Sequence, residues 1–67
     1  MEKILTRREK DVFDLLTKNY TTSEIADELN ITKKTVRNHI SNVIQKLGVC
    51  SRTQAILELI KLNEINF

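Results

Sequence analysis

Apolar residues recur along this chain at the spacing of amphipathic α-helices. In the clearest stretch, Val36, Ile40, Val43, Ile44 and Leu47 fall on one continuous stripe of a helix. Three other segments show the same period. In the first of them, we expect Phe13 to lie at the flank of the apolar stripe rather than at its centre. Their apolar residues are Val12, Phe13, Leu15 and Leu16, then Ile25, Ala26 and Leu29, then Ala55, Ile56, Leu59, Ile60 and Leu62. The pattern predicts four helices.

Residues suited to capping mark the ends of these helices. Each helix is preceded by a Ser or Thr N-cap, and three of the caps have Glu or Gln at the capping-box spacing: Thr6 with Glu9, Thr21 with Glu24, and Ser51 with Gln54. The fourth cap is Thr32. Residues that tolerate a left-handed backbone follow the helices: Asn19, Asn30, Gly48 and Asn63. The predicted helices are 7–18, Thr22–Leu29, Lys33–Leu47 and 52–62.

Composition agrees with one small all-α domain over residues 1–67. The chain has no Pro, one Gly and three aromatic residues, which favours helices over sheets with tight turns. No apolar run approaches the roughly 20 residues that a membrane-spanning helix needs, and the start of the chain does not resemble a signal peptide. The single Cys50 cannot form an internal disulfide. We therefore expect a cytoplasmic protein.

The second and third predicted helices are joined by only three residues, Asn30, Ile31 and Thr32. A joint this short forces the helices to cross steeply, and the small side chain of Ala26 lets their backbones approach. This is the geometry of a helix-turn-helix, in which the second helix of the pair enters the major groove of DNA. Many helical bundles contain tight turns and never contact DNA, so the turn alone leaves both interpretations open.

Charge is distributed unevenly along the chain. The net charge is only +2, but the segment between Leu29 and Leu57 contains no Asp or Glu. Its five basic residues give it a charge of +5, against −3 for the rest of the chain: Lys33, Lys34, Arg37, Lys46 and Arg52. A solvated helix face usually mixes both signs, so this segregation favours binding to a polyanion.

Residues able to read DNA bases lie opposite the apolar stripe of the third helix. Arg37 can pair with guanine and Asn38 with adenine, each through two hydrogen bonds, while the short Ser41 allows close approach. Backbone phosphates suit other groups, namely the N-terminus of the second helix and nearby basic residues. These candidates are Thr21, Thr22, Ser23, Lys18, Lys33 and Lys46, with His39 in a packing or phosphate-contact role.

Three blocks of sequence resemble the LuxR/GerE-type helix-turn-helix family. They are LTRREKDVFDLL at 5–16, TTSEIADEL at 21–29 and ITKKTVRNHISNVIQKLGVCSRTQAI at 31–56. Together they cover nearly the whole chain, and they are most similar to the stand-alone GerE-like regulators, some of which control sporulation genes. The resemblance implies a compact four-helix domain that binds double-stranded DNA as a dimer. It also implies that the third helix is the recognition helix in the major groove.

Functional residues follow from the resemblance position by position. Base contacts fall on Arg37, Asn38 and Ser41, and backbone contacts fall on Lys33, Lys34 and Thr35. The family often dimerises through the fourth helix, whose outward face here contains Gln54, Leu57, Glu58 and Lys61. Leu57 either buries against its copy in a dimer or flanks the core of its own chain. Ser41 replaces a basic residue found in some members, so their sequence preference does not transfer.

Other functions remain as alternatives at this point. A sigma-factor segment also has an acidic first helix and an E-I-A second helix, but the fourth predicted helix argues against it. The chain also fits the DNA-binding fragment of a larger response regulator, or a helical interaction module that antagonises another regulator. An enzyme has least support, because one His and one Cys form neither a metal site nor a catalytic pair of recognisable spacing. We expect no cofactor, metal or small-molecule ligand, and RNA polymerase is a further candidate partner.

Overall fold

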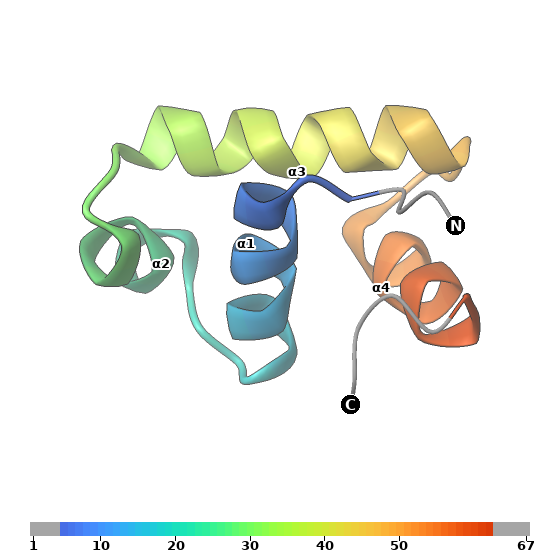
Figure 1. The fold of residues 1–67 in the computed structure, drawn as a ribbon, viewed down its shortest axis with the longest axis horizontal. Coiled ribbons are helices and arrows are strands. Elements are labelled where there is room, and N and C mark those ends of the chain that lie inside the picture. The colour runs from blue at the N-terminus through green and yellow to red at the C-terminus, as the bar shows by residue number, and fades with distance from the viewer. Residues whose placement is uncertain (1–4, 63–67) are drawn as a thin grey trace.

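The computed structural model describes residues 5–62, which form four α-helices. These are α1 (Arg7–Thr17), α2 (Thr22–Leu29), α3 (Lys33–Leu47) and α4 (Arg52–Lys61). Helix α3 lies along one side of the molecule, and the other three helices lie together on its inner side (Figure 1). The predicted all-α fold is confirmed. Helices α1 and α4 each end one residue earlier than predicted, because Lys18 and Leu62 are their C-caps.

The N-terminal caps of the first three helices form as the sequence predicts. The hydroxyl of Thr6 accepts a hydrogen bond from the backbone N–H of Glu9, and the Glu9 carboxylate accepts one from the backbone N–H of Thr6. Thr21 and Glu24 repeat this reciprocal capping box at α2. At α3, the hydroxyl of Thr32 accepts from the backbone N–H of Thr35 at 3.1 Å. Each cap satisfies N–H groups that have no partner within the helix.

The capping box predicted at α4 is wrong in one of its two hydrogen bonds. The Ser51 hydroxyl accepts from the backbone N–H of Gln54 at 3.2 Å. The Gln54 side chain, however, accepts from the backbone N–H of Cys50 at 2.9 Å, and not from that of Ser51. Ser51 has a φ of −148°, against −70° for the cap Thr6. Because φ is the rotation about the N–Cα bond, the N–H of Ser51 has a different direction relative to its helix from that of Thr6, and Gln54 bonds to the N–H one residue further back.

Left-handed residues end the first three helices. Asn19, Asn30 and Gly48 have φ values of 71°, 58° and 67°. After α2, the backbone N–H of Ile31 donates to the carbonyl oxygen of Ala26 at 2.9 Å, the long-range hydrogen bond of a Schellman turn. These turns reverse the chain within a few residues and keep successive helices in contact. Asn63, predicted to play the same role after α4, lies outside the described residues.

The core gathers on the inner side of α3. Val36 and Val43 are fully buried, and Ile40 is nearly so. The predicted position of Phe13 at the flank of the apolar stripe of α1 is wrong. Phe13 is fully buried, whereas Leu15 is only half-buried. The reason is that α1 packs against both α2 and α3, which enclose the side of α1 that carries Phe13. Leu62 was also assigned to an apolar face but is 45% exposed. The buried apolar residues are Leu5, Val12, Phe13, Leu16, Ile25, Ala26, Val36, Ile40, Val43, Ala55 and Leu59.

An ion pair that the sequence did not predict ties α1 to the C-terminal part of α3. The ammonium of Lys46 donates to the Glu9 carboxylate, whose side chain is only 4% exposed, while Lys46 is 37% exposed. The same carboxylate caps α1 through Thr6. Glu9 therefore joins a local cap to a long-range contact, which is how a charged group is accommodated in the interior.

The pKa of Glu9 lies below the ordinary glutamate value. Burial alone raises it, but the hydrogen bonds from Lys46 and Thr6 and the positive charge of Lys46 outweigh burial. A carboxylate whose pKa is lowered by folding stabilises the native state above its unfolded pKa. That contribution is lost as the pH falls through its folded pKa. The Glu9–Lys46 pair therefore stabilises the domain at neutral pH, and its contribution to the free energy of unfolding decreases as the pH falls.

We expect Lys46→Met to lower the free energy of unfolding by about 1–3 kcal/mol at neutral pH, because it leaves a buried carboxylate without its charged partner. The loss should shrink as the pH falls, since protonation of Glu9 removes the pair from the wild type as well. Urea unfolding followed by circular dichroism across pH 3–7 measures both effects.

Lys10→Met is the matched control, because it removes the same charge from an exposed pair. Lys10 contacts Asp14 at 3.1 Å within α1, and both side chains reach solvent. Its cost should stay below about 1 kcal/mol. Equal losses in the two variants, or a Lys46 loss that does not vary with pH, would contradict a stabilising role for the Glu9–Lys46 pair.

Candidate nucleic-acid interface

The outer face of α3 carries the residues predicted to read DNA bases. Arg37, Asn38 and Ser41 are all exposed and lie within little more than one turn of the helix. Burial of Val36 and Ile40 on the inner side fixes the rotation of α3 and turns these three residues outward. The structure thus brings the predicted base-reading residues together on one surface, which we call the reading face.

Helices α2 and α3 meet through the short turn that the sequence predicts. Asn30 takes the left-handed conformation, and Thr32 begins α3 two residues later. Ala26 is 95% buried where α2 packs against α3, so no long side chain separates the two backbones. This is a helix-turn-helix arrangement, with α3 as the outer member of the pair.

Phosphate-binding groups at the start of α2 are less available than the sequence suggests. The hydroxyl and the backbone N–H of Thr21 are both engaged with Glu24, the latter at 2.8 Å. The Glu24 carboxylate also places a negative charge at this end of the helix. Thr22 is half-buried and Ser23 is exposed. These residues remain predicted phosphate contacts, with Thr22 and Ser23 better placed than Thr21.

The residues of α3 predicted to contact the DNA backbone lie in two places, the first turn of the helix and one of its flanks. Lys33 and Lys34 are exposed in the first turn, as is Lys18 after α1. Thr35 is half-buried, and its hydroxyl is 2.9 Å from that of Thr32. His39 is half-buried on the flank that also carries Lys46. Lys46 itself pairs with Glu9, which reduces the charge that it can offer to a phosphate.

The opposite flank of α3 holds a feature that sequence analysis missed. Here α3 and the start of α4 enclose a shallow hollow of about 330 Å³. It is lined by Arg37, Ile40, Ser41, Ile44 and Arg52. In the sequence, Arg52 stands out only as part of the acid-free segment. Its position as the first residue of α4, shortly after the end of α3, was the signal that could have placed it near the reading face.

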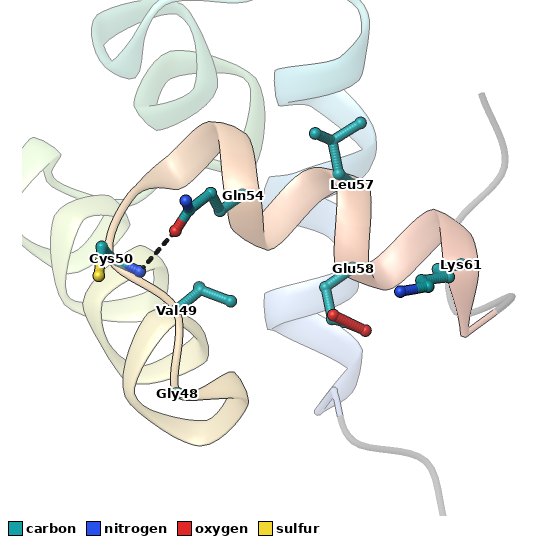
Figure 2. Close-up of a pocket in the computed structure, with 7 residues that line it drawn as sticks. All are labelled: Gly48, Val49, Cys50, Gln54, Leu57, Glu58 and Lys61. Carbon is teal, nitrogen blue, oxygen red and sulfur yellow. Dashed lines mark hydrogen bonds between the residues drawn. The ribbon is translucent and has the colours of Figure 1, made fainter.

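The four residues predicted to form a dimer interface lie on one side of α4. Gln54, Leu57, Glu58 and Lys61 line a second hollow, of about 360 Å³, together with the loop Gly48, Val49 and Cys50 (Figure 2). Leu57 is 62% exposed. It therefore does not pack into the core of its own chain, and an apolar side chain is left on the surface within the predicted dimer interface.

Three further features of the described residues concern metal binding, the single cysteine and the membrane. No group of three His, Cys, Asp or Glu residues in 5–62 is arranged to hold a metal ion. Cys50 is an exposed free thiol in the loop before α4. None of the helices in the same range is long and apolar enough to cross a membrane.

Comparison with known proteins connects this arrangement to a family. Residues 3–59 match the model of the bacterial regulatory proteins of the luxR family. The spore germination protein GerE of Bacillus subtilis (strain 168) is 58% identical over 62 residues, which are 92% of this chain and 84% of that protein. A solved structure of the transcription factor GerE superposes with a TM-score of 0.95 at 55% identity and 97% coverage of both chains.

A longer regulator contains a similar domain. The transcriptional regulatory protein DegU of Brevibacillus brevis is 52% identical over 58 residues, which are 87% of this chain but 25% of DegU. The family match and the likeness to GerE both extend over most of the chain. The chain therefore belongs to the luxR family of bacterial regulatory proteins, as a GerE-like DNA-binding transcription regulator.

Proposed function

We propose that this regulator inserts α3 (Lys33–Leu47) into the major groove of double-stranded DNA and binds a two-fold site as a homodimer. The observation that carries the proposal is the reading face: Arg37, Asn38 and Ser41 are exposed together, opposite the core, in a segment with no acidic residue. The likeness to a spore germination protein extends the proposal to control of sporulation genes.

Arg37 and Asn38 supply the chemistry for direct reading of bases. Arginine donates two parallel hydrogen bonds to O6 and N7 of guanine, while asparagine both donates to and accepts from adenine. Ser41 lies one turn after Arg37 and is short enough to let the helix approach the groove floor. Because the core holds α3 from behind, these side chains are presented on a rigid element, which favours precise recognition.

Lys33 and Lys34 suit contacts with the phosphate backbone. Both are exposed in the first turn of α3, next to the turn from α2. Neither forms an ion pair with a carboxylate of residues 5–62. Contacts of this kind orient the protein on the duplex without reading its sequence, and they make the affinity depend on salt.

The exposed side of α4 is the proposed dimer interface. Leu57 is the exposed apolar residue of that side, and Gln54, Glu58 and Lys61 are its polar neighbours. Interfaces between subunits usually combine buried apolar residues with polar ones at their rim. Two copies related by a two-fold axis would present two α3 helices to the same face of DNA, which matches a palindromic site.

Partners beyond DNA follow from the regulatory role. RNA polymerase is a candidate partner, since a transcription regulator acts on the initiation of transcription. The same role places the protein in the bacterial cytoplasm, where the chromosome lies. DegU shows that a domain of this kind also occurs within longer proteins, and no activity of the rest of DegU is extended to this chain.

We expect Arg37→Ala to cost about 1–3 kcal/mol in binding to the preferred duplex and to relax specificity at one base-pair position. Selecting bound duplexes from a random pool, first with the wild type and then with the variant, measures both effects. If the variant kept full affinity and selected the same site, Arg37 would not be a base-reading residue.

Lys33→Ala is the comparison for the same assay, because it removes a cation proposed to contact phosphate. It should weaken binding to selected and scrambled duplexes by similar factors and reduce the steepness of the salt dependence. The sequence selected from the random pool should stay that of the wild type. A change in the selected sequence would instead assign Lys33 to base reading.

We expect Leu57→Glu to leave the monomer folded and to abolish the homodimer, because each subunit would bring an unpaired charge into the proposed interface. Sedimentation equilibrium measures the association, and circular dichroism checks the helical content. Leu62→Glu is the matched control, since Leu62 is also an exposed leucine but lies outside the four interface residues. Dimers that survive Leu57→Glu would place the interface elsewhere.

A further inference from the structure

The contacts proposed above use only part of the hollow between α3 and the start of α4. It is lined by Arg37, Ile40, Ser41, Ile44 and Arg52, and we call it the arginine hollow. Only Arg37 and Ser41 belong to the reading face. Arg52 comes from a different helix, and its place in the hollow depends on how α4 packs against α3.

The helical period and a tight turn assemble the arginine hollow. Arg37, Ser41 and Ile44 follow one another at i, i+4 and i+7, so they share one flank of α3. Ile40 is buried and Ile44 is half-buried, which gives the hollow an apolar floor. The chain then reverses at Gly48, where the backbone N–H of Val49 donates to the carbonyl oxygen of Ile44 at 3.3 Å. This reversal returns Arg52 to the flank.

Two guanidinium groups meet at the arginine hollow with no carboxylate partner among the described residues. Neither Arg37 nor Arg52 forms an ion pair or a hydrogen bond through its guanidinium with any residue in 5–62. No acidic residue lies between Leu29 and Leu57 in the sequence. Arg52 is also the first residue of α4, where the helix dipole adds partial positive charge. Two guanidinium groups on one hollow, with no carboxylate partner in 5–62, favour an anion between or beside them.

We propose that Arg52 binds a phosphate of the DNA strand that runs along this flank of α3, beside the base pair contacted by Arg37. The proposal rests on the proposed insertion of α3 into the major groove. With α3 in the groove, a strand passes along each of its flanks, and the arginine hollow lies on one of them. Its apolar floor suits the sugar next to the phosphate, since deoxyribose presents C–H groups.

Arg52 is then a positioning residue. A phosphate contact from α4 fixes the rotation of α3 about its own axis, because α4 lies to one side of that axis. Arg37 reads a base correctly only when this rotation is right. Base reading and strand positioning would thus share one hollow while using side chains from two helices.

The test compares Arg52→Ala, Arg52→Lys and the wild type on a duplex selected by the wild type and on a scrambled duplex. Arg52→Ala removes one phosphate contact from each half-site, so the slope of log K against log salt should fall by about 0.9 per subunit, and binding should weaken on the order of fivefold per half-site at 0.15 M salt. Both duplexes should be affected alike, and the selected sequence should not change. Arg52→Lys should retain most of the slope, because it retains the charge.

Lys10→Ala is the control for net charge, since it removes one positive charge from α1, far in sequence from the hollow. It should leave the salt slope of DNA binding unchanged. Ethylation interference locates the contact: one phosphate in each half-site should block the wild type when ethylated and lose this effect with Arg52→Ala. Circular dichroism confirms that each variant is folded.

Three results would overturn the assignment. Arg52→Ala with an unchanged salt slope would remove Arg52 from the phosphate contacts, and an altered selected sequence would make it a base reader. Inorganic phosphate exchanged for chloride at constant ionic strength should displace the wild type and Arg52→Ala equally. Selective displacement of the wild type would assign the hollow to a free anion. If the wild type bound no duplex, the proposed function itself would fail.

Discussion

Burial of one side of α3 is the constraint on which the rest of the structure depends. Val36, Ile40 and Val43 are enclosed by the other three helices, all of which lie on the inner side of α3 (Figure 1). A helix packed in this way has little freedom to rotate, because rotation would carry apolar groups into water. The core and the reading face are therefore two sides of the same helix, and each determines the orientation of the other.

The fold also sorts the positive charges of the acid-free segment. On one flank of α3, Lys46 pairs with Glu9 and joins the helix to α1. On the other flank, Arg37 and Arg52 have no carboxylate partner among residues 5–62. Positive charges that look equivalent in the sequence therefore have different roles. Lys46 holds two helices together, whereas Arg37 and Arg52 are available to a polyanion.

The sequence predicts what depends on neighbours along the chain and misses what depends on other helices. Caps and left-handed residues act within four positions, so the helix ends were right to within one residue. Phe13 was misplaced because its burial depends on α1 packing against two other helices. Glu9 was recognised as a cap but not as a buried partner of Lys46, which is 37 positions away. Arg52 was missed for the same reason.

The reversal at Gly48–Ser51 belongs to both proposed surfaces. It ends the helix that carries the reading face and begins the helix that carries the proposed dimer interface. In a two-fold dimer, this corner would set the distance between the two recognition helices and hence the phase of the half-sites along the DNA. The base sequence that the protein prefers and the spacing of the two half-sites could then change independently in evolution. The preferred sequence can change through single substitutions on α3, whereas the spacing changes only when the conformation of Gly48–Ser51 changes.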